Sequence, residues 1–339
     1  MLALIASCVI TLGGAQGDLK QFRDSFALRL GDAATAKPDP AIQKCMGIIA
    51  NRIRKETTPS SPPAKLEQVL NFYGRGVEAE QTLETDYRSI GGGVSWGQGR
   101  VAIGVRMGAV SSLNVFSTVT GKPITLPQTY RSGIGRSPGP NQSVNFDWLL
   151  RRDCNPSFLP GGMLMVDSPG IQDAGVRYAY DVWFLEPGKG EYPTATKMSG
   201  VWTLGDEKDS HVQVDGLTLT LRSLDPPTAF TTDNVTRLFE TDSIYQLGAG
   251  NPTLVKTETK DRELRELDAW MKRTMGRQTT DLEKQFVAEY GKKPQMLEGY
   301  KLTSPGLSRS TIELKFEKTF TFQVTRGVNG FTVDSLVVQ

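Results

Sequence analysis

The C-terminal end of the chain constrains the fold most, because polar and apolar residues alternate there over a long stretch. From Ile312 to Val324 the even positions are apolar, except Lys318, and the odd positions are polar or charged. A period of two predicts β-strands with one face on a core and the other in water. A pair of strands cannot cover such an apolar face alone, so further strands or helices must pack against it.

The dipeptide Asn329-Gly330 follows this stretch and favours a two-residue type I′ hairpin turn. A turn at this dipeptide keeps the apolar residues of both strands on one face. The cross-strand pairs that it predicts are Val328 with Phe331, Arg326 with Val333, and Phe322 with Val337.

The charge balance excludes two classes of partner. Lys and Arg (39) nearly cancel Asp and Glu (37), and no block of like charge occurs. Nucleic acids and anionic membranes therefore have no electrostatic basis as partners. The apolar run at the start of the chain, residues 1–12, is too short to cross a bilayer, so no integral membrane segment is predicted.

The same first residues predict export. Residues 1–12 are almost wholly apolar and small residues follow as far as Gly17, which is the pattern of a cleaved signal peptide over 1–17. No Lys or Arg precedes the run, and a buried first strand or helix is the alternative. Ile5-Ala6-Ser7-Cys8 also has the form of a lipoprotein signal, in which Cys8 would carry the lipid. We expect a secreted or periplasmic protein.

Removal of the signal leaves Cys45 and Cys154 as the cysteines of the mature chain. In an exported protein this pair can form one disulfide bond. Two buried thiols are the alternative, and the sequence does not decide between them.

Helical spacing of apolar residues predicts helices in two parts of the chain. Asp39-Pro40 fits the N-cap and first position of a helix. A later helix is expected to end at Gly74, and 18–74 is predicted as an N-terminal helical segment. A second group of helices is expected within 257–290, where a capping box begins at Thr280. The stripe expected on the first of these helices is Ile42, Met46, Ile49 and Ile53.

Short runs of β-forming residues between turn signals predict most of the remaining elements. The short connections favour antiparallel pairing, and residues 121–162 are expected to form a long irregular loop of the kind that is usually functional or mobile. The predicted strands are Val77–Tyr87, Arg100–Met107, Ser112–Thr120, Met163–Val166, Val176–Leu185, Met198–Leu204, His211–Arg222, Ser243–Leu247 and Thr253–Thr257.

The order of elements is helices, many strands, helices, and strands again, without the βαβ alternation of a parallel sheet. We therefore predict an α+β fold. It consists of an extended, curved antiparallel β-sheet, partly covered by N-terminal helices and a C-terminal helical pair, and it ends in a β-hairpin. The predicted units are the signal peptide 1–17, the helical segment 18–74 and a sheet domain 75–339.

Gly93-Val94-Ser95-Trp96-Gly97 matches the nucleophile elbow of α/β-hydrolases, and His211 lies downstream. The acids between them are Asp167, Asp173 and Asp181. An elbow needs a helix after the serine, whereas the next run, Val101–Val105, reads as a strand. A glycine-rich turn that contains a serine is the preferred interpretation, with His211 as a surface residue at the start of a strand.

The remaining motifs give no catalytic, cofactor-binding or metal-binding residues. A single histidine excludes histidine-based metal clusters, and the cysteines lack the C-x-x-C spacing of zinc and redox sites. No phosphate-binding loop motif occurs. Aromatic residues could line a sugar- or lipid-binding surface, although in strands they more often belong to the core. They are Trp96, Trp148, Tyr178, Tyr180, Trp183 and Trp202.

We expect an exported, non-enzymatic binding or carrier protein. Its ligand is an apolar small molecule, a lipid, another extended ligand or a partner protein. The alternative is a secreted hydrolase that uses Ser95 with His211, or two of the 37 acidic residues as a carboxylate pair that the sequence does not identify.

Overall fold

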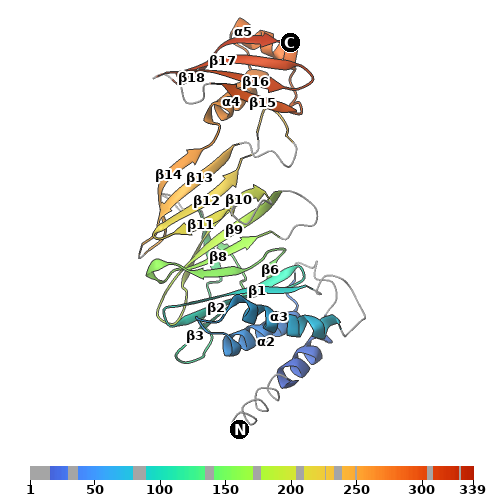
Figure 1. The fold of residues 1–339 in the computed structure, drawn as a ribbon, viewed down its shortest axis with the longest axis vertical. Helices are drawn as coiled ribbons and strands as arrows, with labels where there is room; N and C mark the ends of the chain where they lie inside the picture. The colour runs from blue at the N-terminus through green and yellow to red at the C-terminus, as the bar shows by residue number, and fades with distance from the viewer. Residues whose placement is uncertain are drawn as a thin grey trace.

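The computed structural model describes residues 16–29, 37–78, 89–133, 141–170, 177–203, 210–225, 227–232, 239–248, 250–303, 308–327 and 330–339. The described chain confirms the α+β class, with largely antiparallel strands and a closing hairpin. The predicted extended sheet is divided into four hydrogen-bonded sheets. Figure 1 shows them following one another along the long axis, with the N-terminal helices at one end and the C-terminal unit at the other.

The first sheet has the strand order β1-β2-β3-β6 and carries two helices on one face. Its strands are β1 (Ile90–Gly97), β2 (Arg100–Met107), β3 (Val110–Ser117) and β6 (Leu149–Leu150), and the helices are α2 (Pro40–Glu56) and α3 (Pro63–Glu78). Residues 16–26 are also helical. Asp39 caps α2 as predicted, because its side chain accepts hydrogen bonds from Ala41 N (2.8 Å) and Ile42 N. The predicted stripe of α2 is buried against Val101, Ile103 and Val105 of β2.

Helix α3 is longer than the sequence suggests. Gly74 was expected to end it, but the helix continues to Glu78, so that Val77 is helical and not the start of a strand. A terminating glycine adopts a positive φ, whereas Gly74 does not and keeps the helix intact. Residues 79–87 of the predicted strand lie outside the described part of the chain.

The second sheet has the order β5-β4-β10-β9-β8-β7. Its strands are β4 (Thr129–Ser132), β5 (Asn141–Ser143), β7 (Asn155–Phe158), β8 (Leu164–Pro169), β9 (Arg177–Glu186) and β10 (Thr194–Thr203). Strands β4 and β10 pair in parallel and the other pairs are antiparallel. Residues 121–162, expected to be irregular, therefore contain several short strands.

Glycines allow the first two sheets to approach closely. A Cβ atom on Gly104 of β2 would overlap the carbonyl oxygen of Cys154, which immediately precedes β7. A Cβ on Gly97 of β1 would lie 2.8 Å from Phe158 Cγ in β7, which is too close. The glycine-rich stretch around Ser95 thus serves the packing of β1 and β2 against β7.

The third sheet has the order β11-β12-β13-β14 and packs on the second. Its strands are β11 (Val212–Asp215), β12 (Thr218–Leu224), β13 (Glu240–Gln246) and β14 (Thr253–Thr259). The predicted strand His211–Arg222 is divided into β11 and β12 by a turn at Gly216-Leu217, where Gly216 has a φ of 55°. The shared core contains Trp202 from the second sheet and Leu219 and Tyr245 from the third.

The C-terminal unit consists of the sheet β15-β16-β17-β18 and two helices. Its elements are α4 (Arg262–Gly276), α5 (Asp281–Tyr290), β15 (Gly299–Thr303), β16 (Arg309–Lys315), β17 (Thr319–Gly327) and β18 (Gly330–Val338). The predicted alternation is confirmed, because Ile312, Leu314, Phe316, Phe320, Phe322 and Val324 are all buried. The helices begin at Arg262 and not at 257, because the chain remains paired with β13 as far as Thr259.

The connection between β12 and β13 contributes to the core of this C-terminal unit. Phe230 and Phe239 are buried in the same cluster as the helices α4 and α5. Asp268 of α4 holds the start of the connection, since its carboxylate accepts hydrogen bonds from the backbone N–H groups of Thr228 (2.9 Å) and Ala229 (2.7 Å). The third sheet and the C-terminal unit therefore share a core segment.

The register of the final hairpin differs from the prediction. Arg326 pairs with Phe331, not with Val333, and Gly327 pairs with Gly330. The connection is thus Val328-Asn329, which lies outside the described residues, and the predicted turn at Asn329-Gly330 is displaced. Gly330 instead starts β18 with a φ of 103°, which glycine adopts without strain.

A β-bulge shifts the register further along the same strands. It lies between Gln323 and Val324, where β18 has one extra residue. Phe322 therefore pairs with Leu336, whereas the displaced turn alone would give Ser335 and the predicted partner was Val337. The extra residue on β18 changes which side chains face the core. Leu336 is consequently buried, whereas Val337 is 53% exposed.

The two cysteines are not joined by a disulfide bond. Both thiols are buried, Cys45 in the core under the N-terminal helices and Cys154 in the core between the first two sheets. Of the two alternatives that the sequence left open, the structure has the pair of buried thiols.

Gly104→Ala tests the close approach of the sheets. The added methyl group overlaps backbone, which cannot move aside as a side chain can, so we expect a loss of at least about 2 kcal/mol of unfolding free energy. Gly47→Ala is the matched control, because Gly47 lies in α2 with open space around it and alanine there should stabilise by about 0.5–1 kcal/mol. Urea unfolding followed by tryptophan fluorescence measures both. Equal effects of the two substitutions would contradict this account of the interface.

Glu283→Gln tests the capping box of α5. The Glu283 carboxylate accepts hydrogen bonds from Thr279 N (2.6 Å), Thr279 Oγ1 (2.8 Å) and Thr280 N (3.0 Å), and these bonds lower its pKa below the ordinary 4.5. A lowered pKa in the folded state stabilises the protein above that ordinary value, and the stabilisation disappears as the pH falls through the folded pKa. Wild type should therefore exceed the variant by about 1 kcal/mol at neutral pH, with the difference lost in acid. Unfolding midpoints from pH 7 to 2.5 measure this, with the exposed Glu317→Gln as control.

Candidate functional site

The structure separates Ser95 from the environment that a nucleophile elbow requires. Ser95 lies within β1, and the chain turns at Gln98 and Gly99 directly into β2, without a helix. Its hydroxyl accepts a hydrogen bond from Phe158 N (3.1 Å) of the neighbouring β7. The preferred interpretation placed Ser95 in a turn, whereas it lies in the strand that precedes the turn.

His211 was expected at the surface, and this expectation is wrong. The residue is 3% exposed and its Nε2 lies 2.7 Å from Asp167 Oδ1. Its Nδ1 lies 3.0 Å from the Tyr178 hydroxyl, and the ring packs 4.1 Å from the ring of Tyr180. The histidine sits immediately before β11 and reaches β8 and β9, so it joins the second and third sheets.

The partners of His211 indicate a structural hydrogen-bond chain. A carboxylate accepts, so Nε2 donates to Asp167, while Nδ1 lies within hydrogen-bond distance of the Tyr178 hydroxyl. Burial, with a further contribution from Asp167, raises the pKa of Tyr178 to about 12. The hydroxyl is therefore a poor nucleophile. The structure brings His211 together with Asp167, as a catalytic triad requires. The hydroxyl group next to the second ring nitrogen of His211, however, is that of Tyr178 and not that of Ser95.

The other acids and aromatic residues singled out from the sequence occupy separate places. Asp181 interacts with Ser199 (2.5 Å), Arg152 (3.4 Å) and Lys197 (3.7 Å), and Asp173 lies outside the described residues. The aromatic residues belong largely to the core, as strand aromatics usually do. Trp148, Tyr180, Trp183 and Trp202 are buried, while Trp96 and Tyr178 are half-buried.

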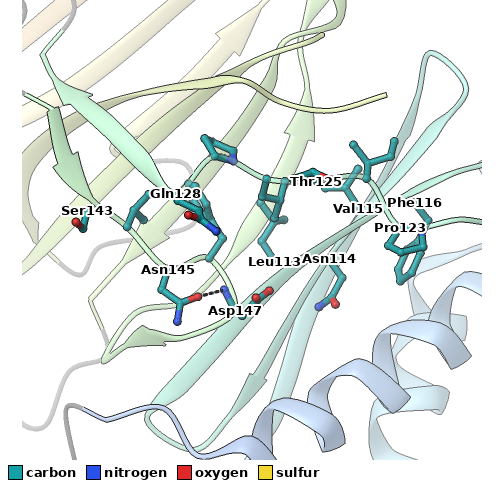
Figure 2. Close-up of a pocket in the computed structure, with 15 residues that line it drawn as sticks. Leu113, Asn114, Val115, Phe116, Pro123, Thr125, Gln128, Ser143, Asn145 and Asp147 are labelled. Carbon is teal, nitrogen blue, oxygen red and sulfur yellow. Dashed lines mark hydrogen bonds between the residues drawn. The ribbon is translucent and has the colours of Figure 1, made fainter. Parts of the chain in front are cut away.

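A groove of about 620 Å³ lies at the outer edge of β3. It arises because the chain leaves the first sheet after β3, forms β4 and β5 in the second sheet, and returns to form β6. The outgoing segment 123–128 and the returning segment 143–147 form its two sides, and Figure 2 shows their side chains around the opening. We call this site the β3 groove.

Each of the two segments is attached to β3 at a different point. Leu113 N donates to the Phe146 carbonyl (2.8 Å) on the returning segment, and Ile124 N on the outgoing segment donates to the Val115 carbonyl (2.8 Å). Between these bonds the strand is still covered, since Leu113 is 1% and Val115 2% exposed. In the described chain, neither the Leu113 carbonyl nor the Val115 N–H has a hydrogen-bond partner.

The base of the β3 groove is buried and apolar. Leu113, Val115, Ile124 and Phe146 are buried in the core between the first two sheets, where Phe146 makes an edge contact with Trp183 at 5.3 Å. Such a base offers apolar contact area without needing to reorganise when a ligand binds.

The rim of the groove is polar and mostly uncharged. Within the described chain, the side chains of Thr125, Gln128 and Ser143 make no hydrogen bond. The Asn145 side chain makes one, in which its Oδ1 accepts from Asp147 N (3.0 Å). Asp147 is the one charged residue among those that line the site. Most of these polar groups therefore remain available to a ligand.

The pKa of the Asp147 carboxyl is raised. Its side chain is solvent-accessible at the rim, yet the surrounding protein raises the pKa of its carboxyl above the ordinary 3.8 by partial desolvation. Among the described residues, no cationic side chain forms an ion pair with it. A carboxylate without a partner in a polar groove attracts a cation or a hydrogen-bond donor.

A second hollow, of about 640 Å³, lies between β14 and the start of α4. Its charged side chains form ion pairs. Arg262 pairs with Glu266 within the hollow (3.3 Å), and Arg265 pairs with Asp225 outside it (2.6 Å). This hollow therefore offers fewer free groups than the β3 groove.

The sequence identified 121–162 as an unusual segment, but it did not identify the residues of this segment that line the β3 groove. The glycine, proline, serine and asparagine content of 121–162 marked it as an unusually long connection. No motif identified Gln128, Asn145 or Asp147, because their role depends on two crossings between sheets.

The described residues contain no cluster of His, Cys, Asp and Glu suited to a metal ion. Nor does any helix among them have the length and apolar character needed to cross a bilayer. No protein-family model matches this sequence, and no curated protein matches it significantly.

Asp147→Asn tests whether this carboxylate is maintained at a cost to stability. A carboxyl whose pKa is raised on folding destabilises the folded state at pH values above that pKa, and the penalty disappears below the ordinary value. The variant should therefore unfold at a slightly higher temperature than wild type at pH 7 and at the same temperature near pH 3. Asp215→Asn, at the exposed end of β11, is the control. A stabilisation that persists in acid would indicate another cause.

Proposed function

We propose that the protein is an exported, non-enzymatic binding protein that holds an extended ligand in the β3 groove. The observation that carries the proposal is the combination of an apolar, fixed base with polar rim groups that have no partner in the described chain. Its volume of about 620 Å³ is typical of sites that bind small ligands or short segments. The polar rim favours an extended polar ligand or a segment of a partner protein over a lipid.

The export part of the proposal rests on the apolar start of the chain, residues 1–12 and the small residues up to Gly17. Mass spectrometry of the protein recovered from the medium or periplasm tests it. A mature N-terminus near residue 16 or 18 is expected, and a full-length cytoplasmic product would contradict it.

The non-enzymatic part rests on the contacts of the residues that a hydrolase would use. Ser95 and His211 have separate hydrogen-bond partners, and Tyr178 keeps its proton. The alternative of a hydrolase makes a distinct prediction, since an active serine reacts with a fluorophosphonate. Labelling of Ser95 by such a probe would contradict our proposal.

Binding at the groove is tested with the full chain and three defined probes. These are a library of blocked heptapeptides, a set of linear hexasaccharides, and phosphatidylcholine vesicles. One probe class should bind wild type and be lost, at least about tenfold, in Thr125→Trp, whose indole fills the groove. Val119→Trp is the matched control, because Val119 is 86% exposed and does not line the site. Binding of no probe, or equal binding to both variants, would refute the proposal.

A further inference from the structure

Strand β14 forms an edge of the third sheet. It is the last strand in the order β11-β12-β13-β14, and Figure 1 shows it at the margin of that sheet, with β13 beside it. Its residues from Thr253 to Glu258 are all exposed, and Leu254 and Val255 are 48% and 66% exposed. The described chain therefore leaves this edge uncovered, and such an edge readily pairs with another strand.

The hydrogen bonds to β13 determine which main-chain groups of β14 lie on the uncovered edge. Lys260 N donates to the Glu240 carbonyl (2.8 Å), and the two strands keep this register back to Lys256. Hydrogen-bonded pairs alternate in an antiparallel ladder, so Lys256 and Glu258 also bond to β13. Thr257 lies between them and presents its N–H and C=O groups on the uncovered edge.

These outward groups allow the strand to pair with a second copy of itself. A two-fold axis at Thr257 places this residue opposite its own equivalent in an antiparallel pair, where each copy donates from its N–H and accepts at its carbonyl. Beside the axis, Lys256 lies opposite Glu258 of the second copy. One step further, Val255 lies opposite Thr259, and the ladder ends there because the pairing of β14 with β13 becomes irregular at Val255.

The charges of the strand are complementary in this arrangement. Lys256 and Glu258 are two residues apart, so they project from the same face, and they already form an ion pair within the strand. Two-fold pairing brings the lysine of each copy against the glutamate of the other, which produces a row of alternating charges. Opposite charges that face each other across two strands stabilise their pairing, whereas an in-register parallel pair would oppose like charges.

We propose that the chain forms a two-fold symmetric dimer in which the β14 strands of two copies pair antiparallel about Thr257. The third sheets of the two copies, four strands each, then form one continuous sheet. A second copy is the occupant of this edge because the strand matches its own sequence both in main-chain groups and in charge. The dimer does not depend on a ligand in the β3 groove, which lies on other strands.

Sedimentation velocity of the full chain tests the charge match. Wild type should convert from monomer to dimer as its concentration rises. Lys256→Glu and Glu258→Lys each oppose like charges at two symmetric places, so each should weaken dimerisation at least about tenfold. An equimolar mixture of the two variants restores both pairs of opposite charges and should form a heterodimer. Lys292→Glu, at an exposed position of the C-terminal unit, is the control for the change in net charge.

Thr257→Pro tests the main-chain bonds. Proline removes the outward N–H group and is tolerated at such a position of an edge strand, so the monomer should unfold at the wild-type temperature while the dimer is lost. A wild type that stays monomeric at every concentration would overturn the proposal and leave the edge to a different partner. A mixture of the two charge variants that stays monomeric, or a dimer that Thr257→Pro does not weaken, would also overturn it.

Discussion

The close packing of β7 on β1 and β2 is the interaction on which the rest of the architecture depends. It requires a bare backbone at Gly104, where the carbonyl oxygen of Cys154 occupies the place of a side chain. Because the chain must reach this position after β3, it crosses to the second sheet and returns before β7 begins. Those crossings produce the two segments that diverge from the edge of β3, so the groove is a consequence of how the sheets are joined.

The groove carries features that folding alone does not require. Asp147 keeps a charged group where desolvation disfavours it, and the rim places several hydrogen-bonding side chains without partners in the described chain. One donor and one acceptor on the edge of β3 have no hydrogen-bond partner among the described residues, although the flanking segments cover this edge. Residues that lower stability without serving the core are typical of binding sites.

Local patterns predicted the elements well and their connections less well. The alternation from Ile312 and the stripe on α2 depend on periodicity alone, and both are buried as expected. The hairpin register was wrong because the turn lies one residue before Asn329-Gly330, and a bulge on β18, which has no sequence signature here, then changes parity within the strand. His211 was misplaced because its burial depends on Asp167 and Tyr178, which reach it only after the sheets have packed. The groove was missed for the same reason, since it exists only between segments that are distant in sequence.

The segment between β12 and β13 has a consequence for the order in which the protein can be completed. Phe230 and Phe239 leave the ribosome before any part of α4 to β18, yet they are buried only against those later elements. Until Asp268 is available, the N–H groups of Thr228 and Ala229 also lack the carboxylate that binds them. The nascent chain therefore exposes two phenylalanines until synthesis is nearly finished, and the C-terminal part from Arg262 onward covers a loop made earlier.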